Sequence, residues 1–364
     1  MDTDDTQQEE MEGNPSADQP SEAAENPATA PEPEPAAVET LAPTPSASIL
    51  PAHRMPTLPQ LAIALGMLAL LFGASYLPMG EKQKKEVGRK AGVERPTGEP
   101  DGSAFNDVQL TAHAAYVWDI KNQKALFNKN ASAQLPLASL TKLMTALVAY
   151  EHLQSDDQIS ITQQAVEQEG DSLLATGHTF TLRELTDLTL ITSSNDGAYA
   201  LAAAAGAALD QDHAERAFID AMNAKAEEIG LSQSYFTNPT GLDVDGAKSG
   251  SYGSARDMAF LMEYLVLHRP EILEGTKDAL RTVYNQEGLA FNAFNTNEVT
   301  HDIPGILGSK TGFTRLAGGN LVIAYDAGLN RPIAIAVLGS TREGRFNDVM
   351  TLIEKTGTAL GTKQ

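Results

Sequence analysis

The segment 137–144 constrains this chain most strongly, because it places two polar side chains on what otherwise reads as a core helix. Four apolar residues recur at the spacing of a single helix face: Leu140, Leu143, Met144 and Leu147. Ser139 stands at the expected start of this helix, and Lys142 follows one turn later on the same side. The sequence therefore predicts a hydroxyl and an amine within reach of each other at the edge of a buried helix.

A serine and a lysine in this arrangement can serve catalysis. A serine hydroxyl is a poor nucleophile until a neighbouring base accepts its proton, and a lysine can be that base only when its amine is neutral. Burial and a second nearby cation both lower a lysine pKa and so favour the neutral amine. The alternative interpretation is structural: Ser139 caps the helix and Lys142 extends to solvent, which is what one such pair signifies when it stands alone.

The acidic balance of the chain excludes one class of partner. Of the 364 residues, 48 are Asp or Glu and 26 are Lys or Arg, and residues 1–52 hold twelve acids without a Lys or Arg. Residues 103–364 still carry 31 acids against 19 bases. Because nucleic-acid phosphates require a basic face, no nucleic-acid partner is expected.

Disulfides and metal sites are not expected either. The chain has no cysteine, and its seven histidines show no ligand-like pairing. Asp243 and Asp245 beside Gly246 resemble the end of a calcium loop, but the other ligand positions and the closing Glu are missing, so we interpret them as a solvated turn. Neither a metal nor another cofactor is expected.

Composition divides the chain into four parts. Residues 1–54 are acidic and rich in proline, which predicts a disordered tail. Residues 58–79 contain the uncharged run 61–77, which as a helix is about 25 Å long against a hydrocarbon core of about 30 Å, and we interpret them as a single transmembrane anchor. A cleaved signal peptide is the alternative, but it does not follow so long an acidic region. Residues 80–108 read as a polar linker and residues 109–364 as the catalytic domain.

Two arguments predict opposite orientations for this anchor. Six bases follow the span: Lys82, Lys84, Lys85, Arg89, Lys90 and Arg95. Only Arg54 lies just before it, so the positive-inside rule would place the C-terminal domain in the cytoplasm. The chemistry inferred below requires this domain on the extracellular or periplasmic side of the cell membrane, and we adopt that orientation as a hypothesis.

Alternating apolar residues predict five strands, two at the start of the domain and three near its end. The expected strands cover 114–119, 125–128, 305–313, 320–325 and 332–339. They predict an α/β (α+β) fold with one antiparallel sheet, packed by the first and last helices of the domain. The intervening helices would form a separate cluster, with the active site where sheet and cluster meet.

Capping signals locate several helices. Paired capping residues precede two of them: Thr181 with Glu184, and Asp212 with Glu215. The first of these helices would deliver residues 192–195 at its end, where an alanine-rich helix begins near Asp196. The second would end before Gly230. A last amphipathic helix is expected over 347–360.

Three short motifs stand in order along the chain: Ser139-Leu140-Thr141-Lys142, Ser193-Ser194-Asn195 and Lys310-Thr311-Gly312. Each alone is a weak signal. Together, on a helix, a helix-end loop and a strand, motifs of the types S-x-x-K, S-D-N and K-T-G are the signature of penicillin-binding proteins and class A β-lactamases. On these residues the chain resembles the D-alanyl-D-alanine carboxypeptidases of the low-molecular-mass penicillin-binding protein family, over roughly residues 110–357.

Further stretches carry the same resemblance: 194–198, 237–242, 255–258, 295–297 and 308–314. It implies a β-lactamase/transpeptidase-like fold, in which a five-stranded antiparallel sheet is flanked by helices and a helical cluster stands beside it. The chain differs from the commonest build of the family in two respects. No β-rich domain is expected after the catalytic domain, and the anchor is N-terminal.

The resemblance implies a catalytic role for four side chains. Ser139 would attack the carbonyl carbon of the penultimate D-alanine of a stem peptide, and neutral Lys142 would accept its proton. Ser193 would pass a proton to the leaving amine. Lys310 would orient Ser193 and, through its positive charge, keep Lys142 deprotonated.

The resemblance also implies the substrate contacts. Asn195 would hydrogen-bond the substrate amide, Lys310 would face the substrate, and Thr311 would bind its terminal carboxylate. The backbone N–H groups of Ser139 and Phe313 would form the oxyanion hole. Gly312 would let the substrate lie against the strand. Peptidoglycan stem peptides are therefore the expected substrates, and β-lactams the expected covalent inhibitors.

Three nearby residues receive no catalytic role. Arg345 is interpreted as an exposed arginine at a helix start, although an arginine reaches the substrate carboxylate in some relatives. Asp257 and Asn297 are expected to support the fold through hydrogen bonds rather than to touch substrate.

Other functions use the same groups. A β-lactamase would need a deacylating base, usually a Glu in an E-x-x-x-N loop between the second and third motifs, and no convincing candidate stands there. A D,D-endopeptidase acting on peptidoglycan cross-links shares all the machinery and stays open. A catalytically silent wall-binding or β-lactam-sensing module is the alternative from another class, although every group that the chemistry needs is present.

Overall fold

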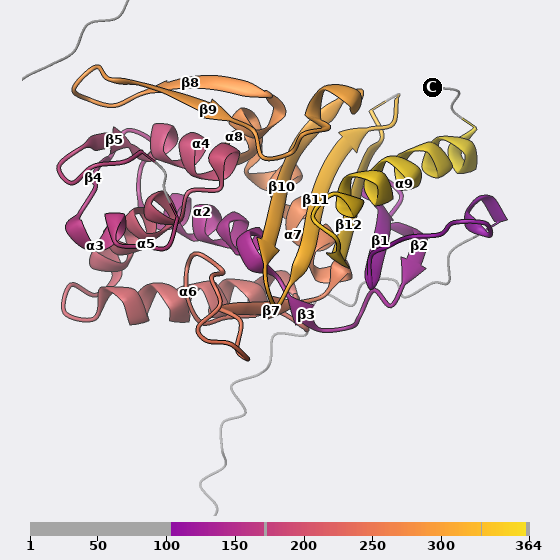
Figure 1. Ribbon diagram of the computed structural model, residues 1–364, viewed down its shortest axis with the longest axis horizontal. Helices are drawn as coiled ribbons and strands as arrows, with labels where there is room; N and C mark the ends of the chain where they lie inside the picture. The colour runs from indigo at the N-terminus through magenta and orange to yellow at the C-terminus, as the bar shows by residue number, and fades with distance from the viewer. Residues whose placement is uncertain (1–102, 171–172, 329, 362–364) are drawn as a thin grey trace, which may run out of the picture. The chain divides into compact units, whose positions relative to one another are not determined.

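The computed structural model describes residues 103–170, 173–328 and 330–361, and its main sheet has the five antiparallel strands that the sequence predicts (Figure 1). The strand order is β10-β11-β12-β1-β2, so strands from the two ends of the domain lie side by side and β10 lies at an edge. The bounds are β1 (Ala114–Asp119), β2 (Lys124–Lys129), β10 (Ile306–Thr314), β11 (Gly318–Asp326) and β12 (Pro332–Ser340).

Alternation along the strands creates a core on each face of this sheet. In β1, Ala115 and Val117 join the apolar cluster that includes the buried side chains of α9 (Gly344–Leu360). Tyr116 and Trp118 point to the opposite face, where the Trp118 ring centroid lies 5.1 Å from that of Phe260 in α7 (Ala255–His268). Because successive side chains in a strand point to opposite faces, both sides of β1 are buried between helices.

The helix on the inner face of the sheet is not the predicted one. The sequence predicted the first helix of the domain there, but α7 (Ala255–His268) packs on β1, β11 and β12 instead. The first long helix, α2 (Thr141–His152), lies within the helical cluster. All its residues from Thr141 to Tyr150 are buried, and a helix that is buried all round needs helices on several sides rather than one sheet.

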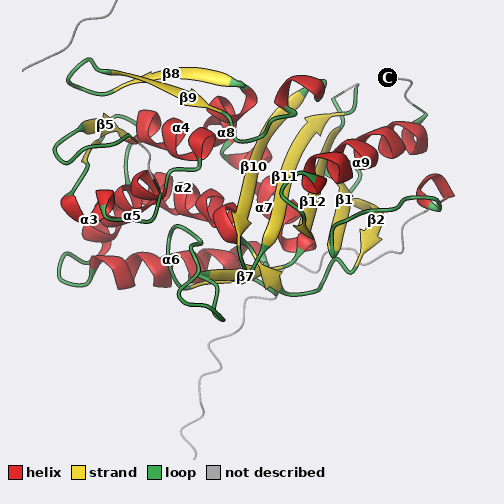
Figure 2. Cartoon of the chain, viewed as in Figure 1, coloured by secondary structure: helices red, strands yellow, loops and turns green. Residues whose placement is uncertain are grey.

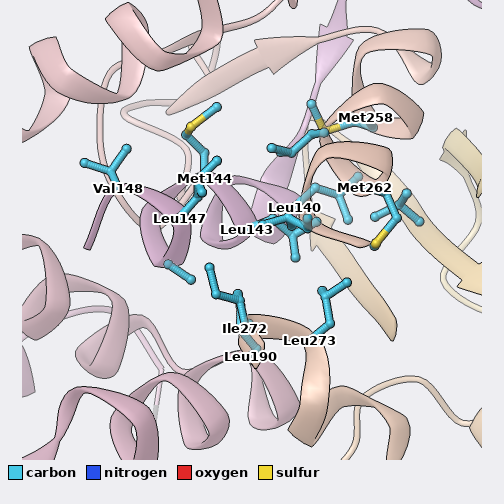
Figure 3. Close-up of a cluster of buried hydrophobic side chains, with 14 of the residues drawn as sticks. Leu140, Leu143, Met144, Leu147, Val148, Leu190, Met258, Met262, Ile272 and Leu273 are labelled. Carbon is cyan, nitrogen blue, oxygen red and sulfur yellow. The ribbon is translucent and has the colours of Figure 1, made fainter. Parts of the chain in front are cut away.

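The helical cluster stands beside the main sheet, and in Figure 2 most of its helices lie to the left of β10. Its helices are α2, α3 (Gln163–Val166), α4 (Leu182–Thr192), α5 (Asn195–Leu209), α6 (Ala214–Ile229) and α8 (Pro270–Leu273). In Figure 3 the apolar side chains of α2 meet Met258 and Met262 of α7 on one side and Ile272 and Leu273 of α8 on the other. Thus α2 joins the cluster to the part of the fold that carries the sheet.

One of the two predicted capping boxes is present. The Thr181 hydroxyl accepts from the Glu184 N–H while the Glu184 carboxylate accepts from the Thr181 N–H, and this box opens α4. The predicted pair of Asp212 and Glu215 is wrong, because His213 is the N-cap of α6 and makes no side-chain capping bond. The side chain of Asp210 accepts the N–H groups of residues 212 and 213 in that turn instead.

The ends of two helices differ little from expectation. Helix α6 ends at Ile229, before Gly230 as predicted, and the Gly230 φ of +84° is the left-handed conformation that favours glycine at a helix C-terminus. Helix α9 begins at Gly344, three residues before the predicted start at residue 347.

Short strands and 3₁₀ helices complete the described chain. The strands are β3 (Leu135–Pro136), β4 (Gln158–Ser160), β5 (Thr179–Thr181), β6 (Tyr235–Phe236), β7 (Ser251–Gly253), β8 (Leu280–Tyr284) and β9 (Ala290–Phe294), paired as β3-β7-β6, β4-β5 and β8-β9. The 3₁₀ helices are η1 (Ser103–Phe105), η2 (Ala138–Leu140), η3 (Glu274–Lys277) and η4 (Thr300–Asp302). The hairpin of β8 and β9 matters below, because it leads directly into residues of the site.

The N-terminal predictions fall mostly outside this description. The expected tail 1–54 and anchor 58–79 lie outside the described residues, and among the residues described no helix combines the length and apolarity that a bilayer crossing requires. Residues 103–108, expected in the linker, already belong to the folded part. Phe105 is buried beside α9, and Lys355 of that helix forms an ion pair with Asp107 at 2.7 Å.

Candidate active site

Ser139 lies in η2, between two fixed backbone segments. Before it, the side-chain amide of Asn320 in β11 donates to the carbonyls of Pro136 and Leu137, at 3.0 Å each. After it, the chain enters α2, and the Thr141 hydroxyl donates back to the Ala138 carbonyl at 2.7 Å. Ala138 itself has a φ of +50°, which a non-glycine residue rarely adopts and which surrounding structure must hold in place. Ser139 is half-buried and held rigidly at the start of α2.

The amine of Lys142 is completely buried and has three polar neighbours. Its Nζ lies 2.9 Å from Ser139 Oγ, 2.7 Å from Asn195 Oδ1 and 2.7 Å from the Thr240 carbonyl oxygen. An amide oxygen and a carbonyl can only accept hydrogen bonds, whereas a hydroxyl can also donate. A neutral amine, with two N–H groups and one lone pair, therefore matches the three neighbours with the lone pair facing Ser139. Burial lowers the pKa of Lys142 to about 7, so this neutral form is accessible near neutral pH.

The Thr240 carbonyl is a part of the site that the sequence interpretation missed. Its loop is fixed by Asn238, whose Oδ1 accepts the N–H groups of Thr240 at 3.2 Å and Gly241 at 2.7 Å. Gly241 has a φ of +76°, and any side chain there would collide with the Ala138 carbonyl. The signal is present in the stretch 237–242, which in the sequence carries only a part of the resemblance.

The second motif sits where α4 passes into α5. Ser193 adopts left-handed backbone angles (φ +63°, ψ +32°) at the end of α4, and the Ser194 hydroxyl caps α5 by accepting from the Gly197 N–H at 2.9 Å. This turn separates the two functional side chains. Asn195 points to Lys142 and donates from Nδ2 to the Glu169 carbonyl at 2.5 Å, while Ser193 points to the third motif.

Lys310 in β10 links the strand to the second motif. Its Nζ lies 2.9 Å from Ser193 Oγ and donates to the Thr311 carbonyl at 2.9 Å, and the side chain is almost fully buried. Burial lowers the pKa of Lys310 strongly, and repulsion from the charges of Lys142 and Arg345 lowers it further. Two ammonium groups are therefore disfavoured together at this site.

Arg345 does not lie where the sequence suggested. It is buried at the start of α9, and its guanidinium donates to the Gly312 carbonyl at 2.9 Å. Burial and the neighbouring charge of Arg342 lower the pKa of Arg345 to about 10, still well above neutral pH, so it carries a positive charge. The interpretation of Arg345 as an exposed arginine is wrong, because the partner that makes its burial tolerable is a carbonyl on another element.

Contacts within the protein give a reason for glycine at position 312, beside the predicted approach of the substrate, which stays a prediction. A Cβ at this position would lie 2.9 Å from the Leu137 carbonyl oxygen and 3.2 Å from Ser139 N, so glycine is required by the close approach of β10 to η2 within the protein. Phe313 follows Gly312 in the same strand. The two backbone segments that would supply the oxyanion-hole N–H groups, those of Ser139 and Phe313, are therefore neighbours. That role for them stays a prediction.

Thr311 is buried beside Lys310, and its hydroxyl lies 2.6 Å from the hydroxyl of Thr296.

Asp257 supports the fold, since its carboxylate accepts from the Gln233 N–H at 2.7 Å and the Ser234 hydroxyl at 2.9 Å. Asn297 is buried too, but it accepts the N–H and the hydroxyl of Thr300 at its backbone carbonyl rather than at its side chain.

The structure thus brings the three motifs together. Ser139, Lys142 and Asn195 form one hydrogen-bonded group, and Ser193 and Lys310 form another. A hydroxyl beside a buried amine of lowered pKa can be activated as a nucleophile, and a second hydroxyl beside another amine can transfer a proton. The arrangement is suited to acyl transfer through a serine ester.

Comparisons with known proteins agree with this chemistry. A sequence profile of the family described as D-alanyl-D-alanine carboxypeptidase matches residues 101–342. The chain is 31% identical to the D-alanyl-D-alanine carboxypeptidase DacF of Bacillus subtilis, over 70% of this chain and 64% of the relative. It is 30% identical to a D-alanyl-D-alanine endopeptidase of Pseudomonas aeruginosa, over 63% of this chain and 72% of the relative.

The fold comparison gives the same picture. The crystal structure of penicillin-binding protein D2 from Listeria monocytogenes, in its ampicillin-bound form, is similar with a TM-score of 0.59 and 30% sequence identity. The match covers 68% of this chain and 98% of that chain. The chain spans slightly less than two thirds of the Bacillus relative.

Proposed function

The chain belongs to the D-alanyl-D-alanine carboxypeptidase family, and from this membership and the site geometry we propose that it removes the terminal D-alanine from peptidoglycan stem peptides through an acyl-enzyme. One observation carries the proposal: Ser139 Oγ lies 2.9 Å from a buried lysine amine whose pKa is lowered to about 7. A penicillin-sensitive serine peptidase needs this pair for its first step.

In the first step, Ser139 Oγ attacks the carbonyl carbon of the penultimate D-alanine while its proton passes to Lys142 Nζ. Asn195 and Thr240 accept the two N–H groups of the neutral amine, which leaves its lone pair directed at the serine. The carbonyl oxygen gains negative charge, and the backbone N–H groups of Ser139 and Phe313 would stabilise it.

In the second step, the peptide C–N bond breaks and the leaving nitrogen takes a proton from Ser193. Lys310, 2.9 Å from Ser193 Oγ, orients this hydroxyl and resupplies its proton. Free D-alanine departs, and the peptide remains attached to Ser139 as an ester. A water molecule then attacks the ester carbonyl, which releases the shortened peptide and restores the serine hydroxyl.

The terminal carboxylate of the substrate would bind at the end of β10. Two side chains with amine or guanidinium groups contact the backbone of this strand, in a domain that is otherwise acidic: Lys310 Nζ contacts the Thr311 carbonyl, and the positively charged Arg345 contacts the Gly312 carbonyl. Charge-assisted hydrogen bonds to an anion are stronger than neutral ones, so a free carboxylate would be selected. A β-lactam that acylates Ser139 would be a covalent inhibitor, and the ampicillin-bound relative supports this expectation.

A D,D-endopeptidase activity is the second candidate, because relatives from Escherichia coli and Pseudomonas aeruginosa carry that name at 27% and 30% identity.

Purified full-length protein should be incubated with a monomeric pentapeptide and, separately, with a cross-linked peptide dimer. We expect mass spectrometry to find the pentapeptide shortened by one alanine. Cleavage of the dimer alone would favour the endopeptidase. A protein that cleaves neither but still binds peptidoglycan or penicillin would be a wall-binding or sensing module.

We also propose that residues 58–79 anchor the protein in the cell membrane and that the catalytic domain faces the extracellular or periplasmic side. The support is the uncharged run 61–77 together with a substrate found in the cell wall. Reporter fusions at Gln364 should be active outside the cytoplasm. Activity of a cytoplasmic reporter at this position would reverse the orientation, as the bases after the span would predict.

A further inference from the structure

Thr296 contacts the site from the segment that follows the β8–β9 hairpin, and no catalytic or binding role has yet been given to it. Its Oγ1 lies 2.6 Å from Thr311 Oγ1. The segment is held in place by Asn295, whose Nδ2 donates to the carbonyls of Thr276 at 3.0 Å and Asp278 at 2.9 Å. The position of the Thr296 hydroxyl is therefore fixed from outside the motif that it contacts.

A hydroxyl has one proton, so one member of this pair must donate to the other. The other acceptor near Thr296 Oγ1 is the Ile191 carbonyl, but it is 3.4 Å away and already accepts the Thr296 N–H at 3.1 Å. The 2.6 Å contact fits two orders of donation. In one, Thr296 donates to Thr311, and the Thr311 proton is free to point to a ligand. In the other, Thr311 donates to Thr296, and Thr296 donates to the Ile191 carbonyl.

The direction of the hydrogen bond between Thr296 and Thr311 decides whether the Thr311 hydroxyl presents a proton or a lone pair to a ligand. When Thr296 donates to it, Thr311 presents a proton, which attracts a carboxylate. If Thr311 donated to Thr296 instead, it would present lone pairs, which repel a carboxylate. An anionic ligand therefore favours the order Thr296, Thr311, carboxylate, with each hydroxyl donating to the next group and strengthening the following bond.

From this geometry we infer that Thr296 is a positioning residue, which orients the Thr311 hydroxyl to donate to the terminal carboxylate of the substrate. The inference rests on the proposed function, since it assigns the order of donation within that substrate site. The carboxylate is bound in the ground state and in the transition state alike, so loss of Thr296 should raise KM and leave kcat nearly unchanged.

The test is a double-mutant cycle on D-alanine release from the pentapeptide by the full-length protein. Thr296→Val removes the hydroxyl with little change in shape and should raise KM about fivefold, the effect of one net hydrogen bond. In a Thr311→Val background the same substitution should change KM by less than about twofold, because the group that it orients is gone. Thr296→Ser, which restores a hydroxyl, should recover the wild-type KM.

Thr282→Val is the matched control, because Thr282 lies in the hairpin that precedes Thr296 and its hydroxyl donates to the exposed Asn292 at 3.1 Å. Its KM should equal that of the wild type, and thermal melts should show all variants folded. An unchanged KM in Thr296→Val, an equal loss in both backgrounds, or a loss in kcat alone would overturn the inference. If the wild type itself releases no D-alanine, the proposed function fails first and the inference falls with it.

Discussion

Replacing Ser139 by alanine should abolish covalent labelling of the protein by fluorescent penicillin and lower D-alanine release by about 10⁴-fold or more. The acyl group has to be carried by Ser139 Oγ, the hydroxyl that faces the Lys142 amine at 2.9 Å. The backbone donors and the carboxylate site remain in the variant, but they cannot form an ester. Labelling is read as fluorescence on a denaturing gel, and release is read as free D-alanine.

Ser132→Ala is the matched control for this substitution. Ser132 lies seven positions earlier, is exposed and belongs to none of the three motifs, so its variant should label like the wild type. The Ser139→Ala protein should keep its melting temperature, because a half-buried hydroxyl contributes little to stability and the apolar residues around it are unchanged. If the Ser139→Ala variant still forms a covalent penicillin adduct, another residue is the nucleophile.

The regular elements near the site could be predicted because their signals are local. The strands of the main sheet carry alternating side chains or continuous apolar runs, and β12 lies within one residue of its predicted bounds. The helix α4 opens at the capping box of Thr181 and Glu184 that its sequence displays. Each signal depends on residues a few positions apart, which is the range over which helix and strand periodicity act.

The pairing of elements was harder to predict, because it depends on residues far apart in the chain. The apolar stripe of α2 predicts a single buried face that packs on the sheet, yet small residues such as Thr145, Ala146 and Ala149 allow the other faces to be buried as well. A helix that can be buried on every side lies among other helices, and this left the inner face of the sheet to α7. Packing, rather than helix propensity, decided this part of the fold.

The site shows the same difference between local motifs, which can be predicted, and contacts between distant residues, which cannot. The motif residues were predicted to meet, and in the structure they do, but the groups that support them were missed. Arg345 is buried because the Gly312 carbonyl, 33 positions away, accepts its hydrogen bond, and Thr296 faces Thr311 because Asn295 fixes its segment. Nothing in the local pattern around such residues distinguishes them from surface residues, since the partner that compensates burial belongs to another element.

The second large effect concerns Lys142, whose loss should lower the rate of penicillin acylation by about 10³-fold, the usual contribution of a general base. Lys142→Ala removes the group that accepts the Ser139 proton, whereas Ser193, Lys310 and the carboxylate site are kept. Thermal melts should show the variant folded, although Asn195 Oδ1 and the Thr240 carbonyl lose a donor. An acylation rate equal to that of the wild type would remove the lysine from the mechanism.

The pH dependence of acylation tests the same assignment with the protein intact. Burial lowers the pKa of Lys142 to about 7, and only the neutral amine can accept a proton. The wild-type rate should therefore rise with pH up to about 7, change by about tenfold per pH unit well below that value, and level off above it. A wild-type rate that does not change between acidic and neutral pH would mean that Lys142 is not the base, whatever its distance from Ser139.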